Sequence, residues 1–169
     1  MINVDLLNGR KGNDSIVGSA IADSLQGESG DDTLAGGDGN DLIDGGNDHD
    51  LLSGNGGDDT LTGGKGKDSF VFHNLDEGVD IITDFSVKDD ILLFSAISFG
   101  DDLVAGVISS EMFVIGTAAT DSEHRFIYDD LSGDLFYDRD GNGDDAQVIV
   151  AQLGSGLNLS HSNFWLDLL

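Results

Sequence analysis

Seven consecutive nine-residue units run without a gap from Gly9 to Val71, and this short period constrains the fold more than any other feature of the sequence. Every unit has glycine at position one, aspartate at position six and an apolar residue at position eight. The glycines are Gly9, Gly18, Gly27, Gly36, Gly45, Gly54 and Gly63, and the aspartates are Asp14, Asp23, Asp32, Asp41, Asp50, Asp59 and Asp68. A fixed period of this kind predicts a solenoid, in which each unit packs on its neighbours.

Each unit is predicted to form a turn over its first six residues and a three-residue strand around the apolar position, with two units completing one coil. The apolar side chains of odd and even units would then stack in two facing parallel sheets, with rungs ~4.8 Å apart. The two stacks are Ile16, Leu34, Leu52 and Phe70, and Leu25, Ile43 and Leu61. The expected fold is therefore all-β, with a parallel β-roll over residues 1–71.

The consensus of the units, G-G-x-G-x-D-x-U-x with U apolar, resembles the calcium-binding nonapeptide repeat of the RTX family. The best copies are G-G-D-G-N-D-L-I-D at 36–44 and G-G-K-G-K-D-S-F-V at 63–71. The unit at 18–26 lacks glycine at positions two and four, so the weakest turn is predicted there. Residues 5–8, D-L-L-N, match positions six to nine of a further unit, which indicates an array that begins before Met1.

The resemblance implies that the repeats bind calcium, which takes six to eight oxygen ligands from carboxylates and backbone carbonyls. Aspartates two units apart would face each other, and glycine would let carbonyl groups turn inward. About five or more ions are expected. The predicted pairs are Asp14–Asp32, Asp32–Asp50, Asp50–Asp68, Asp23–Asp41 and Asp41–Asp59, with Asp5 as a further partner for Asp23. The glycines expected to supply carbonyl oxygens are Gly9, Gly12, Gly27, Gly30, Gly36, Gly39, Gly45, Gly54, Gly57, Gly63 and Gly66.

The charge of the repeats makes their folding depend on the metal. Residues 9–71 carry 13 acidic and 4 basic side chains, a net charge of −9 that five divalent ions would nearly neutralise. Repulsion would oppose folding without calcium, so folding is expected to follow binding. Composition alone would favour an acidic disordered linker. The seven units in register argue against that alternative. A metal-free ice-binding solenoid is a further alternative, but only Thr33 and Thr60 occupy position seven.

The nine-residue period ends after Phe72, and alternating strands follow, which predicts an antiparallel, sandwich-like capping module over residues 72–169. The predicted strands cover 79–85, 90–94, 111–115, 125–128, 134–138 and 147–152, with a tight hairpin at 131–133. The stretches V-D-I-I-T-D-F-S-V-K-D-D-I and R-F-I-Y-D-D-L-S-G-D-L-F-Y-D-R-D-G-N-G are similar to those in serralysin-type RTX carboxy-terminal regions. That resemblance implies a cap for the roll and a chain end, residues 164–169, that a type I exporter reads as an uncleaved signal.

A group of acidic residues after the last unit is a weaker metal candidate. Asp76, Glu77 and Asp80 occur where an incoming turn would need ligands, and they can complete a site beside Asp59. A solvated acidic loop explains the same residues equally well.

A second weak candidate lies in the capping module. Asp138, Asp140 and Asn142 match the first positions of an EF-hand loop, D-x-[DN]-x-[DN]-G. Ile149 stands at position twelve, where an EF-hand has glutamate, so a true EF-hand is not expected. A calcium site of another geometry and an acidic hairpin loop remain open there.

Composition and motifs exclude several classes of function. A net charge of −26 leaves no basic surface for nucleic acid and disfavours anionic membranes. The chain has no cysteine and no run of ~18 apolar residues that would span a membrane. Its four histidines are scattered, and no zinc-protease, nucleophile-elbow or phosphate-loop motif occurs. No enzymatic activity is therefore expected, and none is carried over from the serralysin resemblance.

The sequence thus predicts a calcium-dependent folding and secretion module of a larger secreted, extracellular protein such as a protease, epimerase, toxin or adhesin. The module is expected to be a monomer, with the type I secretion machinery and upstream domains as partners. The alternative hypothesis is a calcium-dependent module that binds a polysaccharide or another surface. Only Lys88, Arg125 and Arg139 are basic after residue 72, which leaves no basic stripe for a polyanion.

Overall fold

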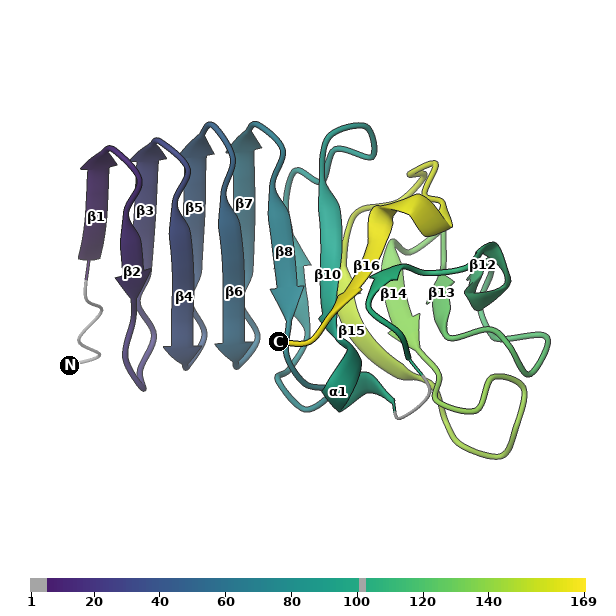
Figure 1. Cartoon of the computed structure of the whole chain (residues 1–169). Coiled ribbons are helices and arrows are strands. Elements are labelled where there is room, and N and C mark those ends of the chain that lie inside the picture. The colour runs from purple at the N-terminus through teal and green to yellow at the C-terminus, as the bar shows by residue number, and fades with distance from the viewer. Residues whose placement is uncertain (1–5, 101–102) are drawn as a thin grey trace.

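The computed structural model describes residues 6–100 and 103–169, and its regular structure is 44% strand and 6% helix. The strands form two sheets (Figure 1). Sheet A has the order β1-β3-β5-β7-β9-β15-β14-β13-β12, and sheet B has the order β11-β16-β10-β8-β6-β4-β2. The predicted all-β fold with a parallel β-roll is confirmed.

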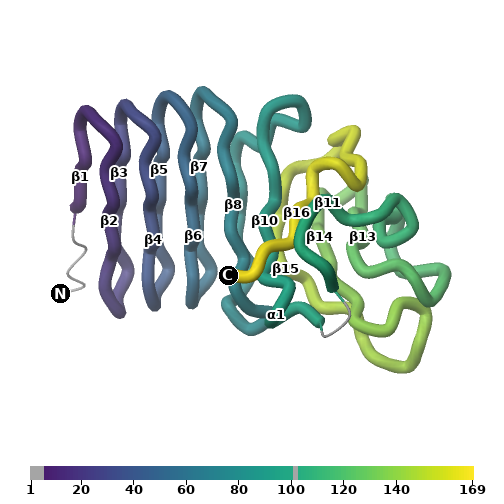
Figure 2. The backbone as a smooth tube through the Cα atoms, in the orientation of Figure 1, coloured from purple at the N-terminus to yellow at the C-terminus, as the bar shows by residue number. Residues whose placement is uncertain are grey.

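The roll is built from strands that alternate between the two sheets and run parallel within each sheet. In sheet A they are β1 (Leu6–Lys11), β3 (Ser24–Ser29), β5 (Leu42–Asn47) and β7 (Thr60–Lys65). In sheet B they are β2 (Ser15–Val17), β4 (Thr33–Asp38), β6 (Leu51–Gly56) and β8 (Ser69–Phe72). Figure 2 shows them as regular coils that follow one another as far as β8.

The apolar position of each unit lies between the two sheets. Both predicted stacks are present, with partners 18 residues apart because two units complete one coil. The fully buried members are Leu25, Leu34, Ile43, Leu52, Leu61 and Phe70. Burial of one side chain per unit therefore forms the continuous core of the roll.

The strands of the roll are longer than the sequence pattern predicts. Each strand from β3 to β7 has six residues, positions seven to nine of one unit and one to three of the next. The predicted six-residue turn and three-residue strand are therefore wrong. Pairing continues because stacked units have the same backbone shape, so Glu28 and Ser29 lie in register with Gly46 and Asn47. Positions four to six alone form the turn.

The second unit departs from its neighbours where it lacks glycine. In other units, positions two and four take a positive φ even without glycine, as at Glu28 (76°) and Asp48 (78°). Ser19 and Ile21 do not adopt this backbone, and β2 has only three residues. The Ser19 N–H and hydroxyl instead donate to Asp23 Oδ2, at 2.7 and 2.9 Å. The irregular turn thus lies where the weakest one is predicted, because a β-branched residue is disfavoured in the left-handed region.

Both sheets continue past residue 72. Sheet A adds β9 (Asp80–Ile82) parallel to β7, and sheet B adds β10 (Ile91–Ser95) parallel to β8. The downstream strands β15 (Val148–Gln152) and β16 (Phe164–Asp167) then pair in parallel with β9 and β10. The chain end therefore lies beside the roll in Figure 1, and the division into domains at residue 72 stays a prediction.

The antiparallel pairs lie at the far end of the molecule from β1. β13 (Phe126–Tyr128), β14 (Asp134–Tyr137) and β15 form a meander, and β11 (Gly106–Val107) pairs with β16. The predicted hairpin at 131–133 joins β13 to β14, and β12 (Phe113–Ile115) runs parallel to β13. The helical elements are α1 (Ala96–Phe99) and two 3-10 turns, Ser110–Met112 and His161–Asn163. Within 6–100 and 103–169, no helix has the length and apolar character needed to cross a membrane.

An aromatic cluster fills the space where the cap closes the roll. The ring centroid of Phe94 lies 4.9 Å from that of Phe72, 4.8 Å from Phe126 and 5.1 Å from Phe99. Phe164 near the chain end is fully buried and lies 5.2 Å from Phe126. The strand pattern does not predict β16, so the burial of the chain end is known only from the structure.

Candidate metal sites

The position-six aspartates form two ladders along the roll. In each ladder the backbone N–H of one aspartate donates a hydrogen bond to Oδ1 of the aspartate one coil later. The first ladder is Asp14, Asp32, Asp50 and Asp68, with N···O distances of 2.7, 2.8 and 3.0 Å. The second ladder is Asp23, Asp41 and Asp59, with distances of 2.8 and 2.7 Å. The structure thus brings together all five predicted pairs of the repeats.

Both ladders continue beyond the repeats. The Asp59 N–H donates to Asp80 Oδ1 at 3.1 Å, and the Asp68 N–H donates to Asp90 Oδ1 at 3.0 Å. The sequence separations are 21 and 22 residues, because longer loops precede β9 and β10. Asp80 is among the predicted candidates, whereas Asp90 is a residue that the sequence reasoning missed.

Asp90 can be recognised in the sequence by the triplet D-x-U, which matches positions six to eight of the repeat although the repeat glycines are absent. Asp80-Ile81-Ile82 and Asp90-Ile91-Leu92 repeat the order of positions six to eight. Ile82 pairs with Leu61 and Leu92 pairs with Phe70, so each triplet is in register with the roll. The triplet keeps its place in the coil although the nine-residue period is lost.

One oxygen atom in several of these carboxylates has no hydrogen-bond partner. The buried, unpartnered Oδ2 atoms belong to Asp14, Asp32, Asp41, Asp50 and Asp59. The last four of these residues are only 1 to 3% exposed. A buried polar atom without a partner is unfavourable, and a charged one more so. These atoms therefore fit a bound cation.

The position-one glycines place carbonyl oxygens beside these carboxylates. A Cβ atom at Gly45 would lie 2.5 Å from Asp50 Oδ2 and 2.8 Å from the Gly63 carbonyl oxygen. Gly27 likewise lies between the Asp32 carboxylate and the Gly45 carbonyl. A side chain at position one would therefore fill a space that oxygens of two coils share.

The position-four glycines have a different role in the backbone. Gly30 and Gly57 have φ of 118° and 136°. Gly30 lies against the carbonyl oxygen of Gly12, and Gly57 lies against the carbonyl oxygen of Gly39, one coil earlier in each case. Within 6–100 and 103–169, no three His, Cys, Asp or Glu side chains gather to hold a metal by themselves. Carbonyl oxygens must therefore complete any calcium site along the ladders.

Burial makes these carboxyl groups hard to ionise. It raises the pKa of Asp41 and Asp50 to about 6 and that of Asp80 to about 8, and repulsion from neighbouring ladder members adds to each rise. Neither of the two ion pairs formed among the described residues involves these three groups. A divalent cation supplies the positive charge that would return such pKa values towards their usual range.

The weaker candidates after the last unit take different positions. Asp76 is exposed, and the Glu77 carboxylate accepts hydrogen bonds from the His73 N–H at 2.9 Å and from Asn74 Nδ2 at 3.2 Å. The charge of Glu77 contributes to the raised pKa of Asp80. The prediction for Asp5 lies outside the described residues.

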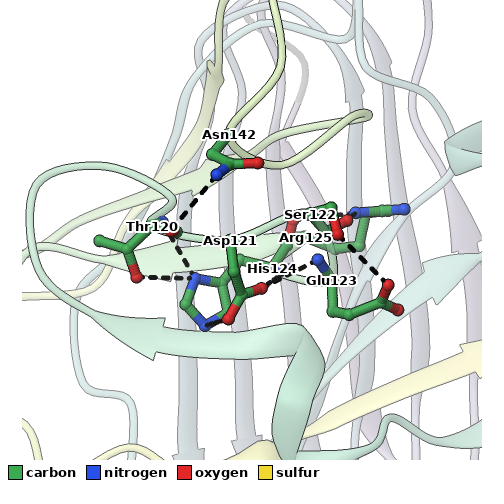
Figure 3. A network of polar contacts seen from close by, with 7 residues as sticks. All are labelled: Thr120, Asp121, Ser122, Glu123, His124, Arg125 and Asn142. Atoms are coloured by element: carbon green, nitrogen blue, oxygen red, sulfur yellow. Dashed lines mark hydrogen bonds and ion pairs between the residues drawn. The ribbon is translucent and has the colours of Figure 1, made fainter.

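The EF-hand-like loop folds around its own acidic side chains. Asp138 is buried, and Oδ1 of Asp140 is buried without a partner. Asp138 Oδ1 accepts from the Asp140 N–H at 3.3 Å, and Asp140 Oδ2 accepts from the Asp145 N–H at 3.2 Å. Asn142 instead donates to the Thr120 carbonyl at 3.4 Å (Figure 3). The structure therefore brings Asp138 and Asp140 together and uses Asn142 to join two loops.

A histidine–aspartate pair lies in the neighbouring loop. His124 Nδ1 accepts from the Thr120 N–H at 3.1 Å, and Nε2 lies 3.3 Å from Asp121 Oδ2 (Figure 3). Asp121 Oδ1 accepts from the N–H groups of Glu123 and His124, at 2.9 and 3.2 Å. Both ring nitrogens of His124 are thus engaged within one loop, so the pair stabilises a turn.

The family is identified by the repeats. Residues 3–20, 17–52 and 44–72 match the RTX calcium-binding nonapeptide repeat, in four copies. The repeat region of this chain therefore consists of RTX-type nonapeptide repeats, and RTX nonapeptide repeats bind calcium. The match ends at residue 72, so Asp80 and Asp90 lie outside it.

The whole chain has a distant likeness among solved structures. It is similar to the AlgE6R3 subunit of the mannuronan C5-epimerase from Azotobacter vinelandii, with 23% identity and a TM-score of 0.36. The similarity covers 96% of this chain and 79% of that chain. At this level it carries neither an activity nor a substrate over to this chain. No curated protein matches the sequence.

Proposed function

We propose that this chain is a calcium-dependent folding and secretion module of a larger extracellular protein. The observation that carries the proposal is the pair of aspartate ladders, in which the Oδ2 atoms of Asp14, Asp32, Asp41, Asp50 and Asp59 are buried without a partner. No ordinary folding requirement accounts for a column of buried carboxylates without counter-charge. A calcium ion between successive coils accounts for the carboxylates, the inward carbonyl groups and the glycines together.

Seven calcium sites are proposed along the ladders. Five are the aspartate pairs of the repeats, and two more are Asp59–Asp80 and Asp68–Asp90. Calcium supplies positive charge to each pair. The aspartates hold their carboxylates in register through the N–H to Oδ1 bonds, and glycine at position one keeps the shared space open.

Folding follows calcium because the empty ladders oppose the folded state. The unfolded chain exposes its carboxylates to water, whereas the folded chain buries them beside one another. Ions that bind only the folded chain shift the equilibrium towards it by mass action. The chain would therefore remain unfolded where calcium is scarce and fold where calcium reaches the ~0.1 to 1 mM range typical of extracellular modules.

This dependence suits export of an unfolded chain. The proposed partners are a type I exporter, which would read residues 164–169, and upstream domains of the same protein. Phe164 and Leu166 are buried in β16 of the folded chain, so an exporter would have to read this segment before folding. Deletion of residues 164–169 from a chain with an upstream reporter should abolish type I export of the reporter. Export that survives the deletion would refute this part of the proposal.

A calcium titration tests the folding part. A chain stripped of calcium should show a disordered far-UV circular dichroism spectrum, gain β-structure as calcium is added, and lose it again with chelator. Magnesium at equal concentration should not replace calcium, because it demands smaller octahedral sites and dehydrates reluctantly. A stripped chain that is already folded and insensitive to calcium would refute the proposal. Equilibrium dialysis should find about seven ions per chain, and a count of five would confine the sites to the repeats.

A further inference from the structure

Two of the three basic side chains after residue 72 meet at one cavity. The cavity has a volume of about 260 Å³, and its lining includes Arg125, Arg139, Ser98, Leu103 and Tyr137. Arg125 directly precedes β13 and Arg139 lies two residues after the end of β14, and these two strands are antiparallel neighbours. The pairing of these strands brings together two positive charges that the sequence leaves apart.

Neither guanidinium group is neutralised within the described part of the chain. Arg125 Nη1 donates to the carbonyl oxygens of Ser122 at 2.7 Å and His124 at 3.1 Å, which fixes the group in place (Figure 3). Arg139 is exposed. The ion pairs of the described residues include neither arginine, although the sequence has 33 acidic residues. Two arginines that form no ion pair with any of the described residues make this cavity suited to an anion.

The remaining wall of the cavity is apolar, with one additional hydroxyl group. Tyr137 is 2% exposed, and its hydroxyl already donates to the Phe99 carbonyl at 2.5 Å, so it forms a buried part of the wall and has no free hydroxyl group. Leu103 adds apolar contact and Ser98 adds a hydroxyl. An adjoining cavity of about 230 Å³ shares Tyr137 and Arg139 but carries the Asp145 carboxylate, which would repel an anion. The first cavity is therefore the better anion site.

We propose that this cavity binds the carboxylate of a single sugar acid. Arginine guanidinium groups match the planar carboxylate and hold it through paired hydrogen bonds. The volume lies just below the ~300 to 1,000 Å³ of drug-sized ligand sites, which suits one small unit. Ser98 and the apolar wall would contact the hydroxylated ring of the ligand.

This site differs from the basic stripe that a polyanion would need. A basic stripe binds many negative charges along an extended polymer, whereas Arg125 and Arg139 lie at one cavity and can bind one negative group. The overall charge of −26 opposes long polyanions. At physiological ionic strength the screening length is ~8 Å, so acidic groups far from the cavity oppose one small anion only weakly. The site is thus selective for a single acidic unit, and it does not depend on the proposed calcium ligands.

Calorimetric and NMR titrations of the calcium-loaded chain with D-glucuronate test the proposal. A dissociation constant on the order of 1 mM is expected from a carboxylate held by charged hydrogen bonds. D-Glucose, which has the same ring without the charge, should not bind. Inorganic phosphate should bind more weakly than glucuronate. NMR shifts should concentrate at Ser98 and Tyr137.

Matched variants separate the site from general charge effects. Arg139→Gln should weaken glucuronate about tenfold or more. Lys88→Gln removes the same charge from a side chain that is 88% exposed and paired with Asp89, and it should change nothing. Arg139→Gln is preferred to Arg125→Gln because Arg125 also ties its loop together. Unchanged circular dichroism of the variants confirms that each remains folded.

Several results would overturn the proposal. These are no binding of glucuronate, equal binding of glucose, phosphate binding as tight as glucuronate, or an Arg139→Gln variant that binds like the native chain. Asp101 and Asp102 join Gly100 to Leu103 and lie outside the described residues. Binding that appears only after Asp101→Asn and Asp102→Asn would assign the arginines to those carboxylates, and it would also overturn the proposal.

Discussion

The substitution Gly45→Ala tests the geometry of one proposed calcium site. The added methyl group would lie 2.5 Å from Asp50 Oδ2 and 2.8 Å from the Gly63 carbonyl oxygen, whereas ordinary contact begins at 3.4 Å. Gly45 does not have a positive φ, so alanine suits its backbone and the conflict is with the Asp50 side chain and the Gly63 carbonyl oxygen. The methyl group would occupy the space that the carboxylate and carbonyl share, and it cannot coordinate an ion.

The cost follows from this overlap. Extra atoms in a packed interior typically destabilise by ~1 to 3 kcal/mol. If about seven ions bind on folding, the free energy of folding depends on the calcium concentration through all seven binding events. A small rise in calcium concentration therefore offsets the whole cost. The calcium midpoint should then rise only about 1.3- to 2-fold. At saturating calcium the melting temperature should fall by roughly 2 to 12 °C.

Circular dichroism melts and calcium titrations measure both changes, and equilibrium dialysis should show the loss of at least one ion. Gly56→Ala is the matched control on the same coil. Its methyl group would meet only the exposed Asp38 side chain, at 3.2 Å, so its effect should stay within ~0.5 kcal/mol. If Gly45→Ala retained the native ion count and melted like Gly56→Ala, the proposed role of position one would be refuted.

Three further perturbations test the ladder extension, the buried charge and the cap. Asp90→Asn should lower the ion count in equilibrium dialysis by one, while Asp89→Asn beside it should not; equal counts would exclude a site at Asp90. Because burial raises the pKa of Asp80 from 3.8 to about 8, the folded calcium-free chain binds more protons than the unfolded chain between these values. Its residual structure should therefore increase from pH 8.5 to 5.5 in a stripped sample followed by circular dichroism, and a decrease would contradict this sign. Phe164→Ala should cost ~3 to 5 kcal/mol at saturating calcium, and Trp165→Ala, at 40% exposure, far less; equal melting temperatures would contradict the role of the aromatic cluster.

Periodicity predicts the roll because identical units in register place identical residues above one another. The two apolar stacks and the five aspartate pairs follow from that rule alone, as Leu25 with Ile43 and Asp32 with Asp50 show. The length of the strands does not follow from it. Positions one to three look like turn residues in isolation, and they become strand only because an identical backbone lies beside them.

The parts that the sequence does not predict depend on contacts between unlike segments. Asp90 occupies a ladder position although extra residues in the preceding loops shift it out of the nine-residue period. Arg125 and Arg139 meet only because β13 and β14 pair antiparallel. Phe164 reaches the core because β16 pairs with β10, far earlier in the chain. Asp90 has a local signal, the D-x-U triplet, but local patterns contain no information about the neighbours of the arginines and of Phe164.

The ladders end where both sheets pass into the cap. Ala151 lies opposite Asp80 in sheet A, so the next strand offers no carboxylate at that place. In sheet B, Phe164 lies opposite Leu92 and the aromatic cluster begins. Packing of large rings thus replaces the proposed calcium-bridged carboxylates as the source of cohesion. Because β15 and β16 are formed by residues 148–167, the coil of β9 and β10 gains its outer neighbours only when those residues are present. Under the proposed function, folding would therefore depend on two conditions, the supply of calcium and the presence of residues 148–167.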